Sequence, residues 1–170
     1  TGSEAQPYKT IDKGITETAA NGTVIIDAGT YNEAAITVDK GITLQAREFN
    51  SLTTVTISNL LTVDATGETI NLGVTGESFL LNGGLTLTDG DVNITTANVE
   101  IADGQTITRT AGTINNTPSV TNVNVTYDGT EDIAAGAELP ADLGTGVLSN
   151  DISNGKTLTV NKAITVAGYP

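Results

Sequence analysis

The sequence predicts an all-β chain built as a solenoid, in which short strands form coils that stack along one axis. The first observation is composition: the 170 residues are rich in Val, Ile, Thr, Gly and Asn, with only two Phe, four Tyr and no Trp. Side chains branched at Cβ favour strands, and Gly and Asn favour tight turns because both tolerate positive φ. The second observation is an apolar pattern of period two, and the third is the short spacing between its repeats.

The stretch with helical periodicity follows an N-terminal tail, residues 1–9. Apolar residues recur there every four positions, at Ile11, Ile15 and Ala19. Thr10 can cap the start of a helix, and Asn21 with Gly22 can end it. We therefore expect a capping segment over residues 10–21, with a short amphipathic helix from Thr10 to Ala20.

Over residues 22–170, apolar residues come in pairs that flank one residue, often Thr. The alternation predicts strands of about three to five residues with inward-facing pairs. Turn signals in a β-sandwich recur about every 8–12 residues, but neighbouring pairs here are commonly six to eight residues apart. Three such strands make a coil of roughly 20 residues, so the segment should hold about seven coils. The later pairs include Leu61 and Val63, Ile70 and Leu72, Leu85 and Leu87, Val92 and Ile94, Val99 and Ile101, Val123 and Val125, Leu158 and Val160, and Ile164 and Val166.

The first four inward pairs define the start of the expected core. Their side chains should be largely buried, because each faces the axis of the solenoid. The eight residues are Val24, Ile26, Ile36, Val38, Ile42, Leu44, Val55 and Ile57.

One internal repeat stands out. "AAITVDKGITLQA" (Ala34–Ala46) aligns without gaps to "KTLTVNKAITVAG" (Lys156–Gly168), 122 residues later. Both segments can be the same corner of one solenoid. Alternatively, the second can be the start of a new unit, as in a tandem or head-to-tail array.

Charge and composition exclude several classes of partner and site. The net charge is −13, with 20 acidic and 7 basic residues, so we expect no nucleic-acid partner. Cys and His are absent, which excludes thiolate metal sites and the commonest general base. No apolar run reaches about 18 residues, so we expect no membrane span. The chain lacks Met, so we expect an extracellular or cell-surface protein whose signal peptide is already removed; the alternative is a cloned fragment, which would also lack Met.

The segment "TIDKGITETAANGTVIIDAGTYNEAAITVDKGITLQA" (residues 10–46) resembles the N-terminal signature of the pectin-lyase-like superfamily of right-handed parallel β-helices. Later stretches, "NGGLTLTDGDVNITT" and "TYDGTEDIAAGAELPADLG", resemble repetitive segments of bacterial surface proteins. The resemblance implies a right-handed parallel β-helix whose N-terminal helix covers one end. It points to a non-enzymatic surface protein of bacterial or archaeal type.

The resemblance also implies what an enzyme of this superfamily would need. Pectate-lyase-like members use clustered Asp for calcium and an Arg base, and polygalacturonase-like members use paired Asp, Gly-His-Gly and Arg-x-Lys. The chain has no His and no adjacent Asp pair, and neither Arg47 nor Arg109 lies in an Arg-x-Lys motif. We therefore expect no catalytic residues, no cofactor site and no enzymatic activity.

Two acidic stretches are weak calcium candidates, because calcium takes six to eight oxygen ligands. Asp89 and Asp91 flank Gly90, and Asp128, Glu131 and Asp132 lie within five residues. The alternative for both is a solvated turn in which Asp and Gly serve backbone geometry.

Four Asn recur at intervals near one coil or half a coil and could form hydrogen-bonded ladders. They are Asn71, Asn82, Asn93 and Asn98. The four Tyr are too dispersed to suggest a sugar-binding platform, so glycan binding has little support.

These features favour an extracellular structural protein, a solenoid subunit that assembles head-to-tail into a filament, stalk or surface layer. The alternative is a carbohydrate-binding or carbohydrate-active β-helix module of a larger surface protein. We expect self-association through the N-terminal tail and the C-terminal coil. A neighbour could receive Thr1–Pro7 as an added strand, or the tail could fold back on its own solenoid.

Overall fold

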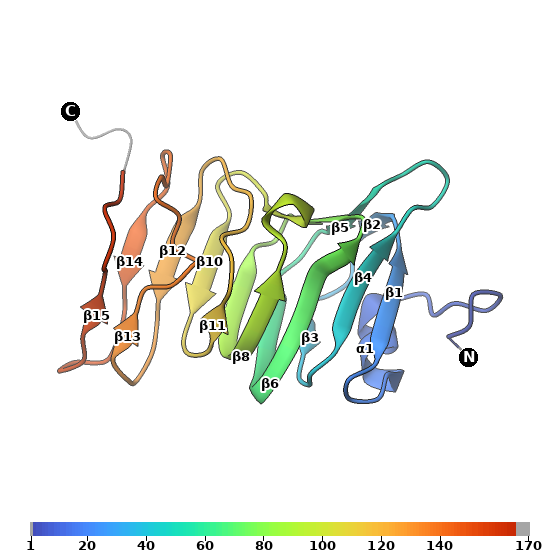
Figure 1. Cartoon of the computed structure of the whole chain (residues 1–170), viewed down its shortest axis with the longest axis horizontal. Coiled ribbons are helices and arrows are strands. Elements are labelled where there is room, and N and C mark those ends of the chain that lie inside the picture. The colour runs from blue at the N-terminus through green and yellow to red at the C-terminus, as the bar shows by residue number, and fades with distance from the viewer. Residues whose placement is uncertain (1, 166–170) are drawn as a thin grey trace.

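The computed structural model of the chain describes residues 2–165 and shows a parallel β-solenoid of about six turns with one short helix. The strands lie side by side from β1 to β15, and the helix α1 lies at the N-terminal end of the stack (Figure 1). The predicted fold class is therefore confirmed, with slightly fewer turns than the seven expected.

The element order is α1 (Ile11–Glu17), β1 (Thr23–Asp27), β2 (Gly29–Tyr31), β3 (Ile36–Val38), β4 (Thr43–Arg47), β5 (Thr54–Ile57), β6 (Leu61–Gly76), β7 (Ser78–Leu81), β8 (Leu85–Ile94), a 3₁₀ turn (Thr96–Asn98), β9 (Val99–Ile101), β10 (Thr106–Arg109), β11 (Thr113–Ile114), β12 (Asn124–Tyr127), β13 (Ile133–Ala134), β14 (Leu148–Asn150) and β15 (Leu158–Thr159).

Every ladder between these strands is parallel. The largest sheet has the order β1-β4-β6-β8-β10-β12-β14, with β3 also on β6 and β11 also on β8. A second sheet has the order β2-β5-β7-β9, and β13 pairs with β15. Thr23 pairs with Thr43, and Ile70 with Val92, which agrees with the predicted coil of roughly 20 residues.

Two strands are longer than the three to five residues predicted. β6 has 16 residues and β8 has 10, because each continues around a corner. The ladder between them shifts register at this corner, between Val63 and Thr69. The corner in β8 is at Gly90, whose φ is +97°. A Cβ on Gly90 would lie 2.6 Å from the carbonyl oxygen of Ala65 on the preceding coil, so only glycine fits this close stacking.

The core is a column of aliphatic side chains along the solenoid axis. All eight residues predicted to begin the core are buried, from Val24 to Ile57. Burial alternates along the strands, as in β1 and β3, because successive side chains point to opposite faces. Tyr127 and Phe79 are the largest fully buried side chains.

The helix is shorter than the predicted Thr10–Ala20. It begins at Ile11 with Thr10 as the N-cap, whose hydroxyl accepts a hydrogen bond from the Lys13 N–H at 3.2 Å. It ends at Glu17, because Thr18 is already extended and its N–H closes the last turn onto Gly14 and Ile15. Ile11 and Ile15 are buried against the core, as the periodicity predicted.

The tail folds back on the first coils, which is one of the two alternatives that the sequence left open. Ser3 and Gln6 form an isolated antiparallel bridge, and Glu4 accepts a hydrogen bond from Arg47 Nη1 at 3.1 Å. At the other end, Ile164 is partly buried, while Val166 and the end of the second repeat segment lie outside the described residues. Within residues 2–165, no helix has the length and apolar character needed to cross a membrane.

We predict that Ile42→Ala lowers the free energy of unfolding by roughly 2–5 kcal/mol, because Ile42 is 1% exposed and its truncation leaves a cavity. The matched control is Ile25→Ala, since Ile25 on β1 is 55% exposed and should cost well under half as much. Urea unfolding followed by circular dichroism measures both. Equal losses for the two variants would contradict the inward and outward assignment.

Candidate functional site

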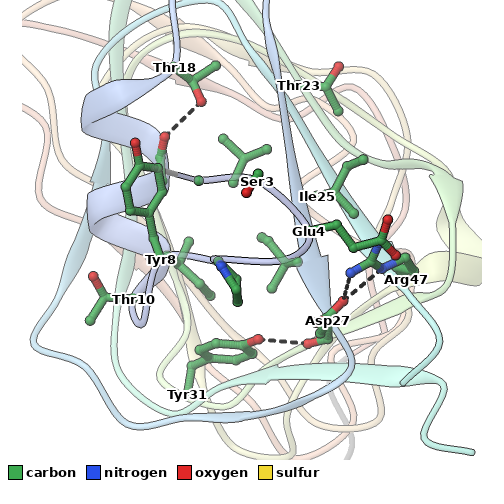
Figure 2. Close-up of a pocket in the computed structure, with 16 residues that line it drawn as sticks. Ser3, Glu4, Tyr8, Thr10, Thr18, Thr23, Ile25, Asp27, Tyr31 and Arg47 are labelled. Atoms are coloured by element: carbon green, nitrogen blue, oxygen red, sulfur yellow. Dashed lines mark hydrogen bonds and ion pairs between the residues drawn. The ribbon is translucent and has the colours of Figure 1, made fainter. Parts of the chain in front are cut away.

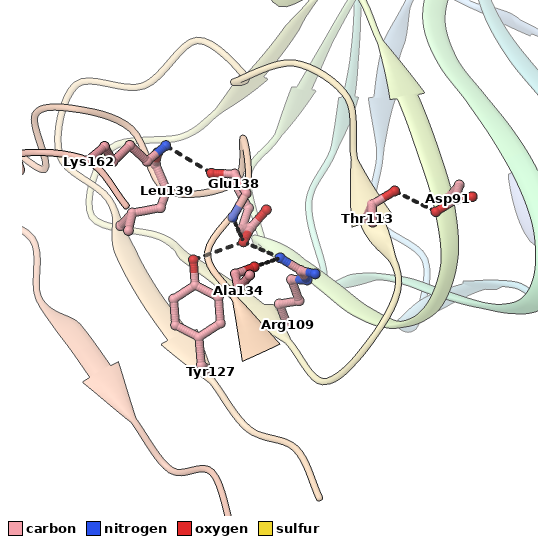
Figure 3. A network of polar contacts seen from close by, with 9 residues as sticks. Asp91, Arg109, Thr113, Tyr127, Ala134, Glu138, Leu139 and Lys162 are labelled. Carbon is pink, nitrogen blue, oxygen red and sulfur yellow. Dashed lines mark hydrogen bonds and ion pairs between the residues drawn. The ribbon is translucent and has the colours of Figure 1, made fainter. Parts of the chain in front are cut away.

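The first pair of calcium candidates does not converge on one point. Asp89 accepts a hydrogen bond from Thr66 Oγ1 at 2.7 Å, on the preceding coil. Asp91 accepts one from Thr113 Oγ1, on the following coil (Figure 3). The Thr66 hydroxyl, followed by the Gly90 N–H, lowers the pKa of Asp89. The two carboxylates thus join coils in opposite directions along the axis, and Gly90 supplies the bend between them.

The second group of calcium candidates is also engaged in contacts between coils. Glu131 forms an ion pair with Lys156 at 2.6 Å, and Asp132 accepts a hydrogen bond from the Thr157 N–H at 2.8 Å. The hydrogen bond with Glu131 raises the pKa of Lys156. Asp128 is exposed on the surface. Among residues 2–165, no three acidic side chains cluster in a way that could hold a metal ion.

A buried polar network at the C-terminal end of the solenoid was not predicted from the sequence. Arg109 Nη1 donates to Glu138 Oε1 at 2.7 Å and to the Ala134 carbonyl at 2.9 Å. The Tyr127 hydroxyl and the Gly136 N–H also donate to Glu138 Oε1, each at 2.8 Å (Figure 3). Three donors on one carboxylate oxygen join β10, β12 and the loop after β13.

Burial and hydrogen bonding oppose each other at Glu138. Burial acts to raise the pKa of Glu138, but the Gly136 N–H and the Arg109 guanidinium outweigh it and leave the pKa below its ordinary value. Burial, followed by the Glu138 carboxylate, raises the pKa of Tyr127 far above its ordinary value. Arg109 Nε and Glu138 Oε2 are buried without a hydrogen-bond partner in the described structure. The Arg109 guanidinium therefore binds Glu138 in the interior and is not exposed at the surface as a base.

Part of the predicted asparagine ladder is present. Asn93 Nδ2 donates to Asn71 Oδ1 at 2.9 Å, and Asn115 donates to Asn93 in the same way. Asn98 instead donates to the Gly73 carbonyl at 3.0 Å, and Asn82 is exposed outside the ladder. Asn115 was not predicted to belong to the ladder, although its spacing of 22 residues from Asn93 equals the spacing of Asn93 from Asn71.

The outward residues between the predicted inward pairs, often Thr, form a second polar column. One outward residue per coil stacks on the next across six strands, from β3 to β14. The column consists of Thr37, Thr62, Thr86, Thr108, Thr126 and Ser149.

The N-terminal end contains a cleft of about 300 Å³ between the tail, α1 and β1. Figure 2 shows Thr23, Ile25 and Asp27 of β1 along one side of the cleft, with Glu4 of the tail beside Ile25 and Arg47. The Tyr31 hydroxyl donates to the Asp27 carbonyl at 2.8 Å. Arg47 Nε donates to the Asp27 carboxylate at 2.7 Å, and Arg47 also binds Glu4 of the tail.

The matched lysines of the internal repeat both bind backbone carbonyls one coil earlier, although the carbonyls are not at matching positions. Lys40 Nζ donates to the carbonyls of Thr16 and Thr18, at the end of α1 one coil earlier. Lys162, its match in the second copy, donates to the carbonyls of Gly136 and Leu139, again one coil earlier. At the same separation of 122 residues, the match extends to six further identical pairs outside the quoted segments. These are Ile11 and Ile133, Gly14 and Gly136, Ala19 and Ala141, Gly22 and Gly144, Thr23 and Thr145, and Asn32 and Asn154.

Comparison of the chain with protein-family models, curated proteins and solved structures finds no match. The superfamily resemblance of residues 10–46 therefore stays a resemblance, and what stands is the parallel β-solenoid itself.

We predict that Glu138→Gln lowers the free energy of unfolding by about 3–5 kcal/mol at pH 7, because it leaves the buried Arg109 charge uncompensated. The pKa of Glu138 is lower in the folded protein than its ordinary value of 4.5, so its carboxylate stabilises the fold above about pH 4.5. That contribution declines as pH falls through the folded-state pKa.

Urea unfolding of both proteins between pH 7 and pH 3 tests this. The difference in free energy of unfolding between wild type and Glu138→Gln should decrease toward pH 3. The control is Glu131→Gln, which removes a surface ion pair and should lower the free energy of unfolding far less than Glu138→Gln does. If the loss in free energy of unfolding caused by Glu138→Gln stays constant from pH 7 to pH 3, the lowered pKa of Glu138 in the folded protein is contradicted.

Proposed function

We propose that the chain is a structural unit of an extracellular assembly, in which copies of the solenoid stack end to end into a filament, stalk or surface layer. One observation carries the proposal. The motif that forms the buried first coils occurs again in the C-terminal coil, where its apolar side chains are much less covered.

Matched positions differ sharply in burial. Val38 of β3 is 0% exposed, because β6 of the next coil pairs alongside it. Its match Val160 is 36% exposed. Apolar surface that faces water favours association, and a coil supplied by a second copy would bury it. Two more pairs differ in the same direction, Ile36 and Leu158, and Ile42 and Ile164.

Several further features support a non-enzymatic surface protein of the pectin-lyase-like type, from a bacterium or an archaeon. Residues 10–46 resemble that superfamily, and α1 covers the N-terminal end of the core. The net charge of −13 keeps single subunits soluble and disfavours nucleic acid as a partner.

We predict that the purified chain forms end-to-end polymers and that Val160→Asp reduces them strongly, because the substitution places a charge in the proposed contact. Negative-stain electron microscopy and light scattering measure polymer length at several salt and calcium concentrations. The matched control is Thr37→Asp on the exposed middle residue of β3, which should polymerise as wild type does. Wild-type protein that stays monomeric under every condition would refute the proposed function.

We predict no lyase or hydrolase activity on polygalacturonate. The Arg109 guanidinium is bound to Glu138 in the interior of the solenoid. Asp89 and Asp91 are hydrogen-bonded to hydroxyl groups on different coils. An assay for unsaturated and reducing ends, with and without calcium, tests this. Turnover that is lost in Asp91→Asn would favour the alternative, a carbohydrate-active module.

A further inference from the structure

We propose that Asn21 is an N-glycosylation site, whose side-chain amide receives a sugar chain from a polyprenyl diphosphate donor. The inference rests on the extracellular placement in the proposed function, because this modification belongs to secreted proteins. It goes beyond that function, since it assigns a modified residue and the chemical class of its donor. It depends on the acceptor motif, on the hydrogen bonds of the side-chain amides, and on the place of Asn21 in the fold.

The acceptor motif for N-linked sugar chains is Asn-x-Thr or Asn-x-Ser, in which x is not proline. The sequence contains Asn-x-Thr four times, beginning at Asn21, Asn93, Asn115 and Asn124. A motif this short also arises by chance in a chain rich in Asn and Thr. The structure separates the four positions, because an amide nitrogen that accepts a sugar must be exposed and free of other bonds.

Two of the four amides belong to the asparagine ladder. Asn93 Nδ2 donates to Asn71 Oδ1 at 2.9 Å, and Asn93 Oδ1 accepts from Asn115 Nδ2. Asn115 Oδ1 in turn accepts from the Ile94 N–H at 2.8 Å. Both polar atoms of each side chain are therefore engaged between coils, so neither amide is free to turn toward an enzyme.

The third amide, that of Asn124, is held by backbone groups. Its Nδ2 donates to the Gly104 carbonyl at 3.0 Å, and its Oδ1 accepts from the Val147 N–H at 3.0 Å. The residue is also partly buried on β12. This amide therefore links three consecutive coils and is not available for a bond to a sugar.

Asn21 differs from the other three in both contacts and exposure. Its side chain is exposed, and within residues 2–165 its amide has no hydrogen-bond partner. Its backbone is fixed, because its N–H donates to the Gly41 carbonyl at 2.7 Å. Thr23, which supplies the hydroxyl of the motif, is also exposed, at the start of β1. Both groups that the acceptor motif requires are therefore open to solvent.

The position of Asn21 suits a bulky substituent. The residue lies in the turn between α1 and β1, at the end where β1 begins. In Figure 1 this turn is at the lower ends of β1 and β4, on a flank of the stack. A sugar chain there would extend beside the solenoid, so it would be compatible with the end-to-end contacts of the proposed function.

The transfer is a substitution at the first sugar carbon and involves no oxidation or reduction. Asn21 Nδ2 forms a bond to C1 of the first sugar, while the bond between C1 and the diphosphate oxygen breaks. Nδ2 loses one proton, and the polyprenyl diphosphate departs as the leaving group. Each subunit then carries one bulky, hydrated chain on its flank.

Transfer to the folded protein tests the site directly. The purified chain is incubated with an oligosaccharyltransferase of Asn-x-Thr specificity and an oligosaccharide linked to polyprenyl diphosphate, and mass spectrometry of peptides locates the product. We expect one sugar chain per molecule, with an occupancy at Asn21 that is roughly tenfold or more above that at any of the other three motifs. Occupancy at none of the four, or mainly at one of the other three, would overturn the proposal.

Matched variants separate the acceptor chemistry from the turn. Asn21→Asp tolerates the φ of 62° at this position but lacks the amide nitrogen, so it should abolish transfer. Thr23→Val keeps a β-branched side chain on β1 but lacks the hydroxyl, so it should also abolish transfer, whereas Thr23→Ser should retain it. Circular dichroism should show all three variants folded as wild type is. Transfer that survives in Asn21→Asp or Thr23→Val would overturn the assignment.

The outcomes for this site and for the proposed function differ. Transfer to Asn21 in a chain that stays monomeric would support the site and refute the filament. Filaments whose subunits accept no sugar would leave end-to-end assembly standing and refute the site.

Discussion

Each coil of this protein is held in place by the next coil, through parallel backbone ladders and a continuous column of inward aliphatic side chains. Leu61 pairs with Ile36 on one coil and with Leu85 on the next, and all three side chains are buried. The stabilising contacts are therefore mostly between neighbouring coils. A solenoid of this kind depends on having a neighbour at every level, which makes its two ends the least satisfied parts of the molecule.

Polar side chains also make most of their contacts between neighbouring coils. The asparagine ladder and the threonine column join coils at the same corner or on the same face, and the candidate calcium ligands Asp89 and Asp91 each bind a hydroxyl one coil away. The buried Arg109–Glu138 pair fixes the loop after β13 against β10, where the coils become irregular. Most of the acidic pattern that suggested metal chemistry thus has a structural role in these contacts.

The two copies of the internal repeat take different structures near the two ends of the described solenoid. At the N-terminal end, α1 buries Ile11 and Ile15 over the core, and Lys40 binds the carbonyls that end the helix. The segment that matches α1, residues 133–139, is not a helix and begins with β13, which pairs with β15. The same motif therefore forms a helix over the first coils and a strand-containing coil near the C-terminal end of the described residues.

The sequence by itself determined the solenoid class, the inward residues and the N-cap of the helix, because period two and short spacing are local properties. It could not determine which polar side chains meet, since a carboxylate pairs with a hydroxyl more than 20 residues away, as Asp89 does with Thr66. The same holds for the strands β6 and β8, which turn corners, and for the buried pair of Arg109 with Glu138. All of them depend on the register between neighbouring coils. Tertiary stacking decided these features, because register between coils is fixed only when the whole column packs together.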